Sequence, residues 1–268
     1  MKKIFRFIKI YWQFICACLL VFTLVFQLIM IAPYLVNKRA LANVTDWGLS
    51  FKDNVPKGNM SKEDLEPYDS YYIGNKEENV IYLTFDAGYE NGYMSDILDV
   101  LREEEVPAAF FLVGHYLKSQ PDLVKRMVNE GHLVCNHTYT HPDMSKIADL
   151  TSLEAELESV RKLYCDITGC EMPKIYRPPQ GKFSLTNLEQ AKELGYKTVF
   201  WSLAYVDWDV NSQPSEQTAL DKLNGRIHNG AVVLLHSTSK TNRNILKDLI
   251  QGWKDQGYTF KPITELIG

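Results

Sequence analysis

Ionisable side chains suited to acid–base and metal chemistry stand at the ends of apolar runs in five separate parts of this chain. They are Asp86 after residues 80–85, His137 and His141 after 132–135, Arg177 after 174–176, Asp207 after 197–206, and His236 after 231–235. Catalytic groups gather at the carboxyl ends of the strands in parallel α/β barrels, because the loops converge there. If these runs are parallel strands, the five segments build one active site.

His137 and His141 are four residues apart in the segment N-H-T-Y-T-H. On a helical turn this spacing puts both imidazoles on one face, about 5–6 Å apart at Cβ, which suits two nitrogen ligands of one divalent ion. The spacing alone also fits one surface histidine and one buried core histidine. The neighbouring strand end that carries Asp86 favours the metal site.

Two carboxylates in these segments have natural partners. Asp86 follows an apolar strand, where a buried carboxylate costs several kcal/mol unless it is paired, and the fork of Arg177 can hold it ionised. Asp207 can accept the N–H of His236, fix its tautomer and raise its pKa, which makes His236 a proton donor. Trp208 is predicted to form a wall of the site. In isolation the same residues also fit a turn, a surface cation and a core histidine.

Other chemistries are less well supported. The chain has no G-x-S-x-G elbow, P-loop or G-x-G-x-x-G segment. Cys135 lies in an apolar run, and burial disfavours its thiolate. Glycoside cleavage by Asp86 and Asp207 is an alternative. Two histidines at ligand spacing favour metal-assisted hydrolysis instead.

Strand-like runs alternate with helical patterns from residue 80 onward. Expected strands are 80–85, 108–113, 132–135, 174–176, 197–203, 231–235 and 258–260, and expected helices are 94–105, 121–131, 151–168, 185–194, 215–228 and 242–256. The pair Thr151 and Glu154 predicts a capping box. The alternation predicts parallel strands joined by helical crossovers. We expect an α/β fold, a distorted (β/α) barrel with seven or eight parallel strands; an open doubly wound sheet is the alternative.

The first 42 residues differ from the rest of the chain. Residues 10–36 are a run of 27 without a charged side chain, preceded by four cations and followed by two. About 20 apolar residues span a bilayer core, and the flanking charges place the N-terminus in the cytoplasm. We therefore expect a transmembrane anchor, or a signal segment cleaved after Ala42. A linker and lead-in (43–78) and the catalytic domain (79–268) would follow outside the cytoplasmic membrane.

The charge of the exported part argues against a nucleic-acid partner. Residues 1–42 hold six basic side chains and no acidic one, so the remainder, with 23 basic and 33 acidic residues, carries a formal charge of −10. Such a surface repels phosphate backbones. Cys165 and Cys170 are close enough in sequence to form a disulfide in an oxidising compartment. The chain has no C-x-x-C segment, which argues against a structural zinc site.

The motifs also occur together in a known family. T-F-D-A-G (84–88), H-T-Y-T-H (137–141), R-P-P-Q-G (177–181), V-D-W (206–208) and L-L-H-S (234–237) resemble, in this order, the motifs of the polysaccharide deacetylases, the NodB-homology enzymes of carbohydrate esterase family 4. The resemblance covers residues 79–268. Segments 84–92 and 200–208 look most like the spore-cortex branch, which deacetylates N-acetylmuramic acid on the way to muramic δ-lactam.

The resemblance implies a role for each matching position. Asp86 would be the general base, oriented by Arg177, and His236 would be the general acid, tuned by Asp207. Apart from the resemblance, the aromatic residues Tyr89 and Trp208 lie near the predicted site, and we expect them to contact the sugar. The implied activity is metal-assisted hydrolysis of the N-acetyl group of N-acetylmuramic acid in peptidoglycan. Alternatives are deacetylation of N-acetylglucosamine in peptidoglycan or a chitin-like glycan, and a catalytically impaired pseudoenzyme that binds glycan.

The resemblance also implies one divalent cation, with zinc the first expectation. His137 and His141 would bind it. Most relatives have a second aspartate, a metal ligand, where this chain has Ala87. Since alanine cannot bind a metal, a third ligand would have to come from water, Asn136 or Asp143, and the cation would be held weakly.

Overall fold

The computed structural model describes Trp12 and residues 18–27, 45–52 and 55–268. The chain divides into two compact units, Met1–Asn43 and Val44–Gly268. Residues 18–27 are helical. Within the described ranges, no helix has both the length and the apolar character needed to cross a bilayer. The predicted anchor, residues 10–36, lies largely outside these ranges and stays a prediction.

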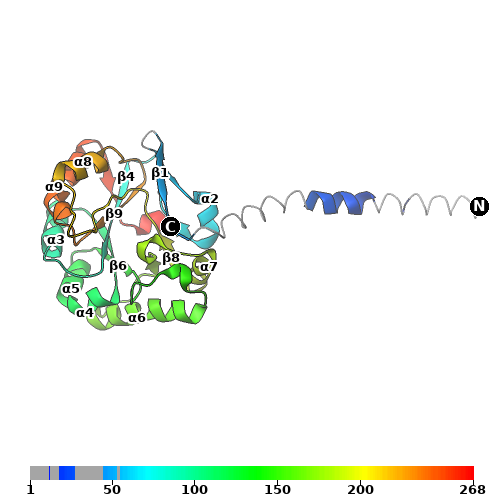
Figure 1. Cartoon of the computed structure of the whole chain (residues 1–268), viewed down its shortest axis with the longest axis horizontal. Helices are drawn as coiled ribbons and strands as arrows, with labels where there is room; N and C mark the ends of the chain where they lie inside the picture. The colour runs from blue at the N-terminus through cyan, green and yellow to red at the C-terminus, as the bar shows by residue number, and fades with distance from the viewer. Residues whose placement is uncertain (1–11, 13–17, 28–44, 53–54) are drawn as a thin grey trace, which may run out of the picture. The chain divides into compact units, whose positions relative to one another are not determined.

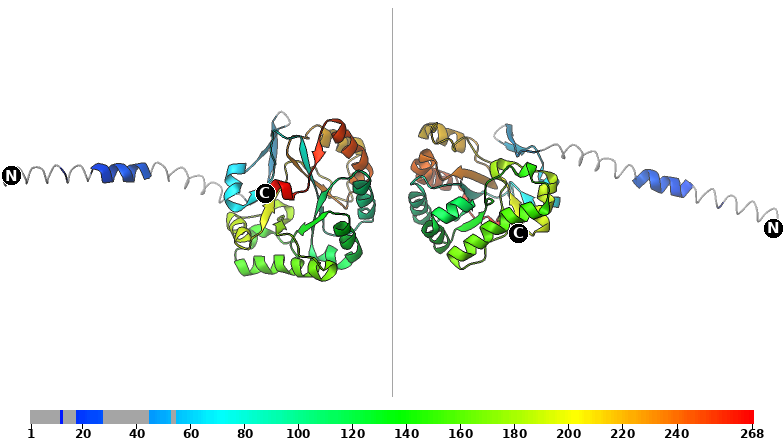
Figure 2. Two further views of the ribbon diagram at one scale, coloured as in Figure 1. Left: turned by 180° about the vertical axis from the view of Figure 1, so that it is seen from behind. Right: turned by 60° about the horizontal axis from the view of Figure 1, so that its bottom comes forward.

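In the described part of the larger unit, an eight-stranded sheet forms the centre (Figure 1). Its strands are β3 (Ser70–Tyr71), β4 (Val80–Ala87), β5 (Ala108–Leu112), β6 (Leu133–Asn136), β7 (Ile175–Tyr176), β8 (Lys197–Val199), β9 (Ala231–His236) and β10 (Thr259–Phe260). The order is β10-β4-β5-β6-β7-β8-β3, with β9 also paired to β4, and each pair is parallel. The sheet curls into a half-barrel (Figure 2), so the predicted parallel α/β architecture is confirmed.

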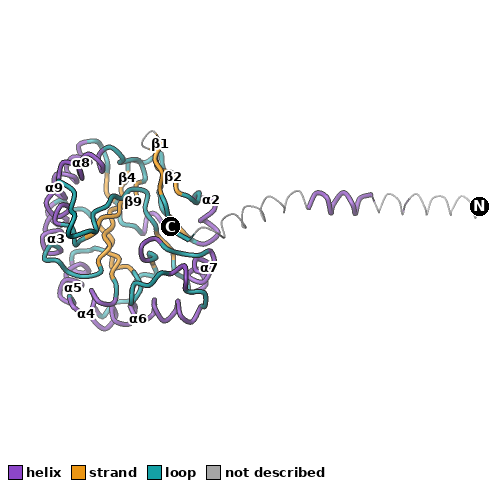
Figure 3. The backbone as a smooth tube through the Cα atoms, in the orientation of Figure 1, coloured by secondary structure: helices purple, strands orange, loops and turns teal. Residues whose placement is uncertain are grey.

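Helices surround this sheet on its outer side (Figure 3). They are α3 (Met94–Glu103), α4 (Gly114–Ser119), α5 (Pro121–Asn129), α6 (Leu150–Thr168), α7 (Leu185–Glu193), α8 (Glu216–Asn224) and α9 (Lys240–Asp255). The short C-terminal α10 (Thr264–Ile267) packs on the other face of the sheet, where Leu266 and Ile267 contact the cluster that contains Val80. Apolar faces of α3, α5 and α9 join β4, β5 and β9 in one core cluster. All eight residues of β4 are buried, as expected for a central parallel strand.

Three local predictions were wrong. The capping box at Thr151 does not form, because Asp149 caps α6 by accepting the backbone N–H of Ser152 at 2.9 Å. Helix α4 has no counterpart in the predicted pattern, because six residues are too few for a clear periodicity. The predicted strand 197–203 ends as β8 at Val199, because the chain then crosses toward β9, where Leu203 bridges Val233.

The segment expected to be a linker and lead-in is built into the larger unit from residue 45 onward. It forms the antiparallel pair β1 (Leu49–Lys52) and β2 (Val55–Gly58), then α2 (Lys62–Leu65) and the 3₁₀ helix η1 (Glu66–Tyr68). Its last strand, β3, pairs with β8 of the sheet. The domain boundaries at residues 42 and 78 stay a prediction, but this part of the lead-in is an ordered layer of the fold.

Candidate active site

The strands β4 and β9 place the predicted base and acid side by side. Asp86 is the next-to-last residue of β4, His236 is the last of β9, and the two are paired in the parallel register. Residues paired across neighbouring strands point to the same side of a sheet. Both side chains line one cavity of about 1090 Å³. The same cavity is lined by His137 and His141, so the strand ends converge as predicted.

Arg177 holds Asp86 in place through a hydrogen-bonded ion pair. Its Nη1 donates to Oδ1 of Asp86 at 2.7 Å and to Oγ1 of Thr84 at 3.0 Å. Its other donors reach the carbonyl oxygens of Val199 and Phe200, and the side chain is fully buried. Burial raises the pKa of Asp86, but the charge and hydrogen bond of Arg177, together with the charges of His137 and His236, outweigh it and hold that pKa below its usual range. Asp86 is therefore ionised at neutral pH.

His137 lies against the other oxygen of Asp86. Its Nε2 is 3.5 Å from Oδ2, and its Nδ1 is 2.8 Å from the carbonyl oxygen of Arg177. Because a carbonyl only accepts, Nδ1 carries the hydrogen and Nε2 keeps a free lone pair. Burial lowers the pKa of His137 to about 4, so the ring is neutral and its contact with Asp86 is not an ion pair.

The two histidines of H-T-Y-T-H meet, but not on a helical turn as predicted. Their rings are 5.0 Å apart on a loop in which Thr138 and His141 have φ angles of 67° and 59°. Glu156 of α6 holds this loop by accepting the backbone N–H groups of Tyr139 and Thr140 at 2.8 and 2.9 Å. The two left-handed residues, rather than a helical repeat, therefore bring the imidazoles together.

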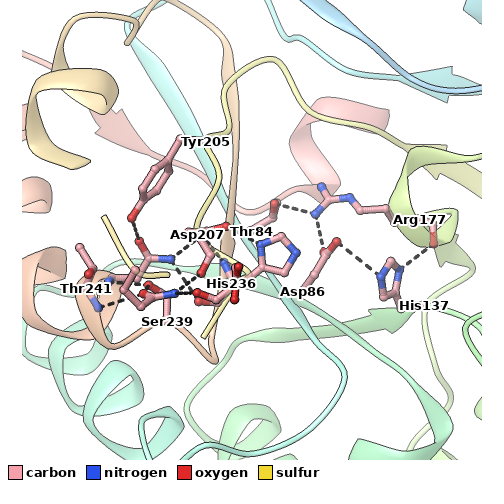
Figure 4. Close-up of polar contacts among 12 residues, drawn as sticks. Thr84, Asp86, His137, Arg177, Tyr205, Asp207, His236, Ser239 and Thr241 are labelled. Carbon is pink, nitrogen blue, oxygen red and sulfur yellow. Dashed lines mark hydrogen bonds and ion pairs between the residues drawn. The ribbon is translucent and has the colours of Figure 1, made fainter. Parts of the chain in front are cut away.

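On the opposite side of the cavity, Asp207 binds His236 twice. Oδ1 accepts from Nδ1 of the ring at 2.7 Å, and Oδ2 accepts from the backbone N–H of His236 at 2.8 Å. Burial lowers the pKa of His236, but the charge and hydrogen bond of Asp207 outweigh it and raise the pKa above its usual value. Figure 4 shows this pair and the Asp86–Arg177–His137 group facing one another.

Asn242, at the buried start of α9, completes this side. Its Nδ2 donates to Oδ2 of Asp207 at 2.6 Å and to the carbonyl oxygen of His236 at 3.1 Å. Its Oδ1 accepts from the hydroxyl of Tyr205. Because Nδ2 faces two acceptors and Oδ1 faces a donor, the orientation of the amide is determined. The carboxylate of Asp207 thus receives three hydrogen bonds, and it is almost inaccessible to water.

Aromatic side chains line the mouth of the cavity. Tyr89 and Trp208 are 44% and 59% exposed and contribute to its lining, together with the less exposed Trp201 and Tyr205. Exposed aromatic rings beside an open cavity offer apolar faces for a ligand. The structure therefore places both predicted substrate contacts at the rim.

The histidines suit a divalent cation only in part. His137 presents the neutral tautomer with a free Nε2, held by a carbonyl as in metal sites, and His141 lies beside it. Among the described residues, however, no group of three or more His, Cys, Asp or Glu side chains is arranged to hold a metal. Ala87 is buried and supplies no ligand.

Both residues suggested as a third ligand are occupied elsewhere. Asn136 donates to the carbonyl oxygen of Leu157 and accepts the N–H of Thr138, each at 2.9 Å. Asp143 caps the 3₁₀ helix η2 (Met144–Lys146) through Ser145. Each side chain stabilises a turn next to the histidine loop, and the third ligand stays a prediction.

The cysteines that the structure describes take no part in the site. Burial raises the pKa of the Cys135 thiol to about 12, which excludes it as a nucleophile at neutral pH, as predicted. Cys165 and Cys170 are free thiols, so the suggested disulfide is absent from the described structure.

The sequence analysis assigned no role to four residues of the site: Thr84, Glu156, Gln180 and Asn242. Thr84 stands two residues before Asp86 on the same strand face, which a period of two could have indicated. Gln180 lines the cavity from the R-P-P-Q-G segment with a φ of 57°. Glu156 and Asn242 lie on surface-type helical patterns, and no local signal distinguishes them.

Comparisons with known proteins agree with this geometry. The polysaccharide deacetylase family matches residues 73–199. The peptidoglycan-N-acetylmuramic acid deacetylase PdaA of Bacillus subtilis is 45% identical over 228 residues, covering 83% of this chain and 85% of its own. The solved structure of Bacillus subtilis PdaA, a family 4 carbohydrate esterase, has a TM-score of 0.78 at 43% identity and covers 82% of this chain and 94% of its own. A family 4 pseudoenzyme from Bacillus anthracis has a TM-score of 0.69 at 27% identity, covering 82% and 77%.

Proposed function

Because this chain belongs to the polysaccharide deacetylase family, we propose that it removes the N-acetyl group from N-acetylmuramic acid in peptidoglycan. It is a hydrolase that acts on carbon–nitrogen bonds other than peptide bonds. The muramic substrate is proposed from the similarity to PdaA, whose name states that activity. The similar pseudoenzyme means that the fold alone does not establish turnover.

One observation carries the proposal: an ionised carboxylate and a proton-bearing imidazole are register partners on β4 and β9 and line the same cavity. Arg177 lowers the pKa of Asp86, and Asp207 raises that of His236. Environments that separate the two pKa values assign one group as base and the other as acid. A module that only binds glycan has no use for this separation.

The mechanism follows from these two groups. Asp86 takes a proton from a water molecule, and the oxygen of this water attacks the acetamide carbonyl carbon. His236, protonated at Nε2, then gives its proton to the sugar nitrogen as the carbon–nitrogen bond breaks. Acetate and a free amine leave. Asp207 and Asn242 keep His236 oriented throughout, and the rim aromatics Tyr89 and Trp208 hold the sugar.

His137 and His141 are the residues that would hold a divalent cation, and we expect zinc. When bound, such an ion polarises the acetamide carbonyl and lowers the pKa of water. The neutral state of His137 keeps its Nε2 available for this role.

The product of the proposed reaction also suits the formation of muramic δ-lactam. On muramic acid the freed amine stands next to the lactyl carboxyl group of the same sugar. Amide formation between the two gives muramic δ-lactam with loss of water. We therefore place the enzyme before lactam formation, in the peptidoglycan of the spore cortex.

The test is acetate release by the full-length chain from peptidoglycan glycan strands, with mass analysis of the digested products. We expect muramic units to lose one acetyl group while glucosamine units keep theirs. Loss of acetyl groups from glucosamine alone would reject the muramic specificity. If neither sugar loses acetyl groups in the presence of added zinc, the proposed deacetylase activity is rejected.

We further infer that residues 10–36 anchor the chain in the cytoplasmic membrane, with the catalytic unit outside. The support is the run of 27 uncharged residues flanked by cations. Cleavage after Ala42 would release the protein instead. Mass determination of the mature protein from membrane and soluble fractions separates these outcomes.

A further inference from the structure

Trp47 of the lead-in contacts two segments that form the wall of the cavity. Its backbone N–H donates to the carbonyl oxygen of Gly181 at 2.8 Å, and its indole Nε1 donates to the carbonyl oxygen of Trp201 at 3.0 Å. The ring stacks on Phe200 with centroids 4.8 Å apart. The side chain is 6% exposed and does not line the cavity itself.

The residues that Trp47 holds are next to those that face the substrate. Gly181 directly follows Gln180, and Gln180 and Trp201 both line the cavity. Gly181 has a φ of 69°, and a Cβ there would lie 2.8 Å from the ring of Trp201 and 3.1 Å from Cβ of Trp47. The two tryptophans therefore enclose this glycine and leave no room for a side chain.

We propose that Trp47 is a positioning residue that holds the Gln180–Trp201 wall of the substrate cavity. The neighbouring backbone strengthens the link, because the N–H of Phe183 donates to the carbonyl oxygen of Thr45 at 2.9 Å. Trp47 thus connects the lead-in to two cavity segments that are 20 residues apart in sequence (181 and 201). This positioning role of Trp47 depends on the proposed function in one respect, the identity of the ligand in the cavity.

The contacts of Arg177 separate this role from catalysis. Arg177 is bonded to Thr84, Asp86, Val199 and Phe200 through its own donors. None of these bonds involves Trp47, so loss of the indole N–H leaves the ionised base in place. The wall should shift while the chemical step continues, which predicts a change in KM rather than in kcat.

The test is Trp47→Phe in the full-length chain, which keeps a ring on Phe200 but removes the indole donor. We expect KM for peptidoglycan glycan strands to rise about fivefold, the effect of one lost hydrogen bond, with kcat within about twofold. The matched control is Trp253→Phe on α9. That indole is fully buried, its Nε1 has no hydrogen-bond partner among the described residues, and it does not line the cavity.

Trp253→Phe should lower the melting temperature and leave KM unchanged. An unchanged KM in Trp47→Phe, an equal rise in both variants, or a fall in kcat alone would each overturn the proposal. Calorimetric Kd values for the same strands, measured in the Asp86→Asn background, separate it from the proposed function. If wild type releases no acetate but Trp47→Phe still weakens binding about fivefold, the deacetylase proposal fails and the positioning role stands.

Discussion

A histidine lies on each side of the cavity, and the two sides shift the pKa of the imidazole in opposite directions. On the Arg177 side, His137 donates from Nδ1 to a backbone carbonyl, and burial lowers its pKa to about 4. On the β9 side, His236 donates from Nδ1 to the carboxylate of Asp207, which outweighs burial and raises its pKa. One ring is neutral and offers a lone pair, and the other keeps its second proton to a higher pH than a free imidazole.

The difference teaches that the partner of Nδ1 determines the role of a histidine here. A carbonyl oxygen fixes the tautomer without adding a full charge, so desolvation dominates. A carboxylate fixes the same tautomer and stabilises the imidazolium. Four substitutions test this contrast.

Asp86→Asn removes the charge that lies between the two histidines and should have the largest effect. Without a general base, kcat should fall by about 10³-fold. Buried Arg177 also loses its charged partner, so the unfolding free energy should fall by about 3 kcal/mol. Acetate assays with circular dichroism as the control for folding measure both; near-normal turnover of a folded variant would remove Asp86 as the base.

His137→Ala removes the neutral ring and leaves the proton-bearing one. Zinc affinity should fall by more than about 100-fold, because loss of a ligand costs more than loss of its outer partner. Elemental analysis of dialysed protein and titration with zinc measure this directly. Unchanged zinc loading would assign the cation to other residues.

Asp207→Asn should make the His236 side resemble the His137 side. With the carboxylate gone, burial outweighs the remaining charge of Asp86, so the pKa of His236 falls. Because His236 then loses its proton at a lower pH than in the wild type, the high-pH limb of the kcat/KM profile should move to lower pH. At neutral pH kcat/KM should fall by about 10²-fold. A high-pH limb in its original place would show that another group supplies the proton.

Asn242→Leu removes one of the three hydrogen bonds to Asp207 and should have the smallest effect, a fall in kcat of about tenfold, typical of one bond to a charged group. The matched control is Thr241→Val. Its hydroxyl donates to the carbonyl oxygen of Pro214 rather than to Asp207. Equal losses in both variants would indicate a general effect on α9.

The fold and most of the site could be predicted from short patterns. The apolar runs at 80–85 and 231–235 became β4 and β9, and the ionisable residues at their ends meet as expected. Patterns failed where contacts are distant in sequence. Asn242 of α9 bonds Asp207, which lies on a loop 35 residues earlier, and Trp47 bonds Gly181, which lies 134 residues later in the sequence (181 − 47). No local period records such pairs.

The sequence by itself determined the alternation of strands and helices and the residue types at the strand ends, because hydrophobic periodicity acts within a few residues. Only the tertiary structure decided that Asp86 and His236 share a register, that left-handed Thr138 and His141 join two imidazoles, and which histidine has a raised pKa. A pKa depends on burial and on charges within a few ångströms in space, and those neighbours come from segments far apart in the chain.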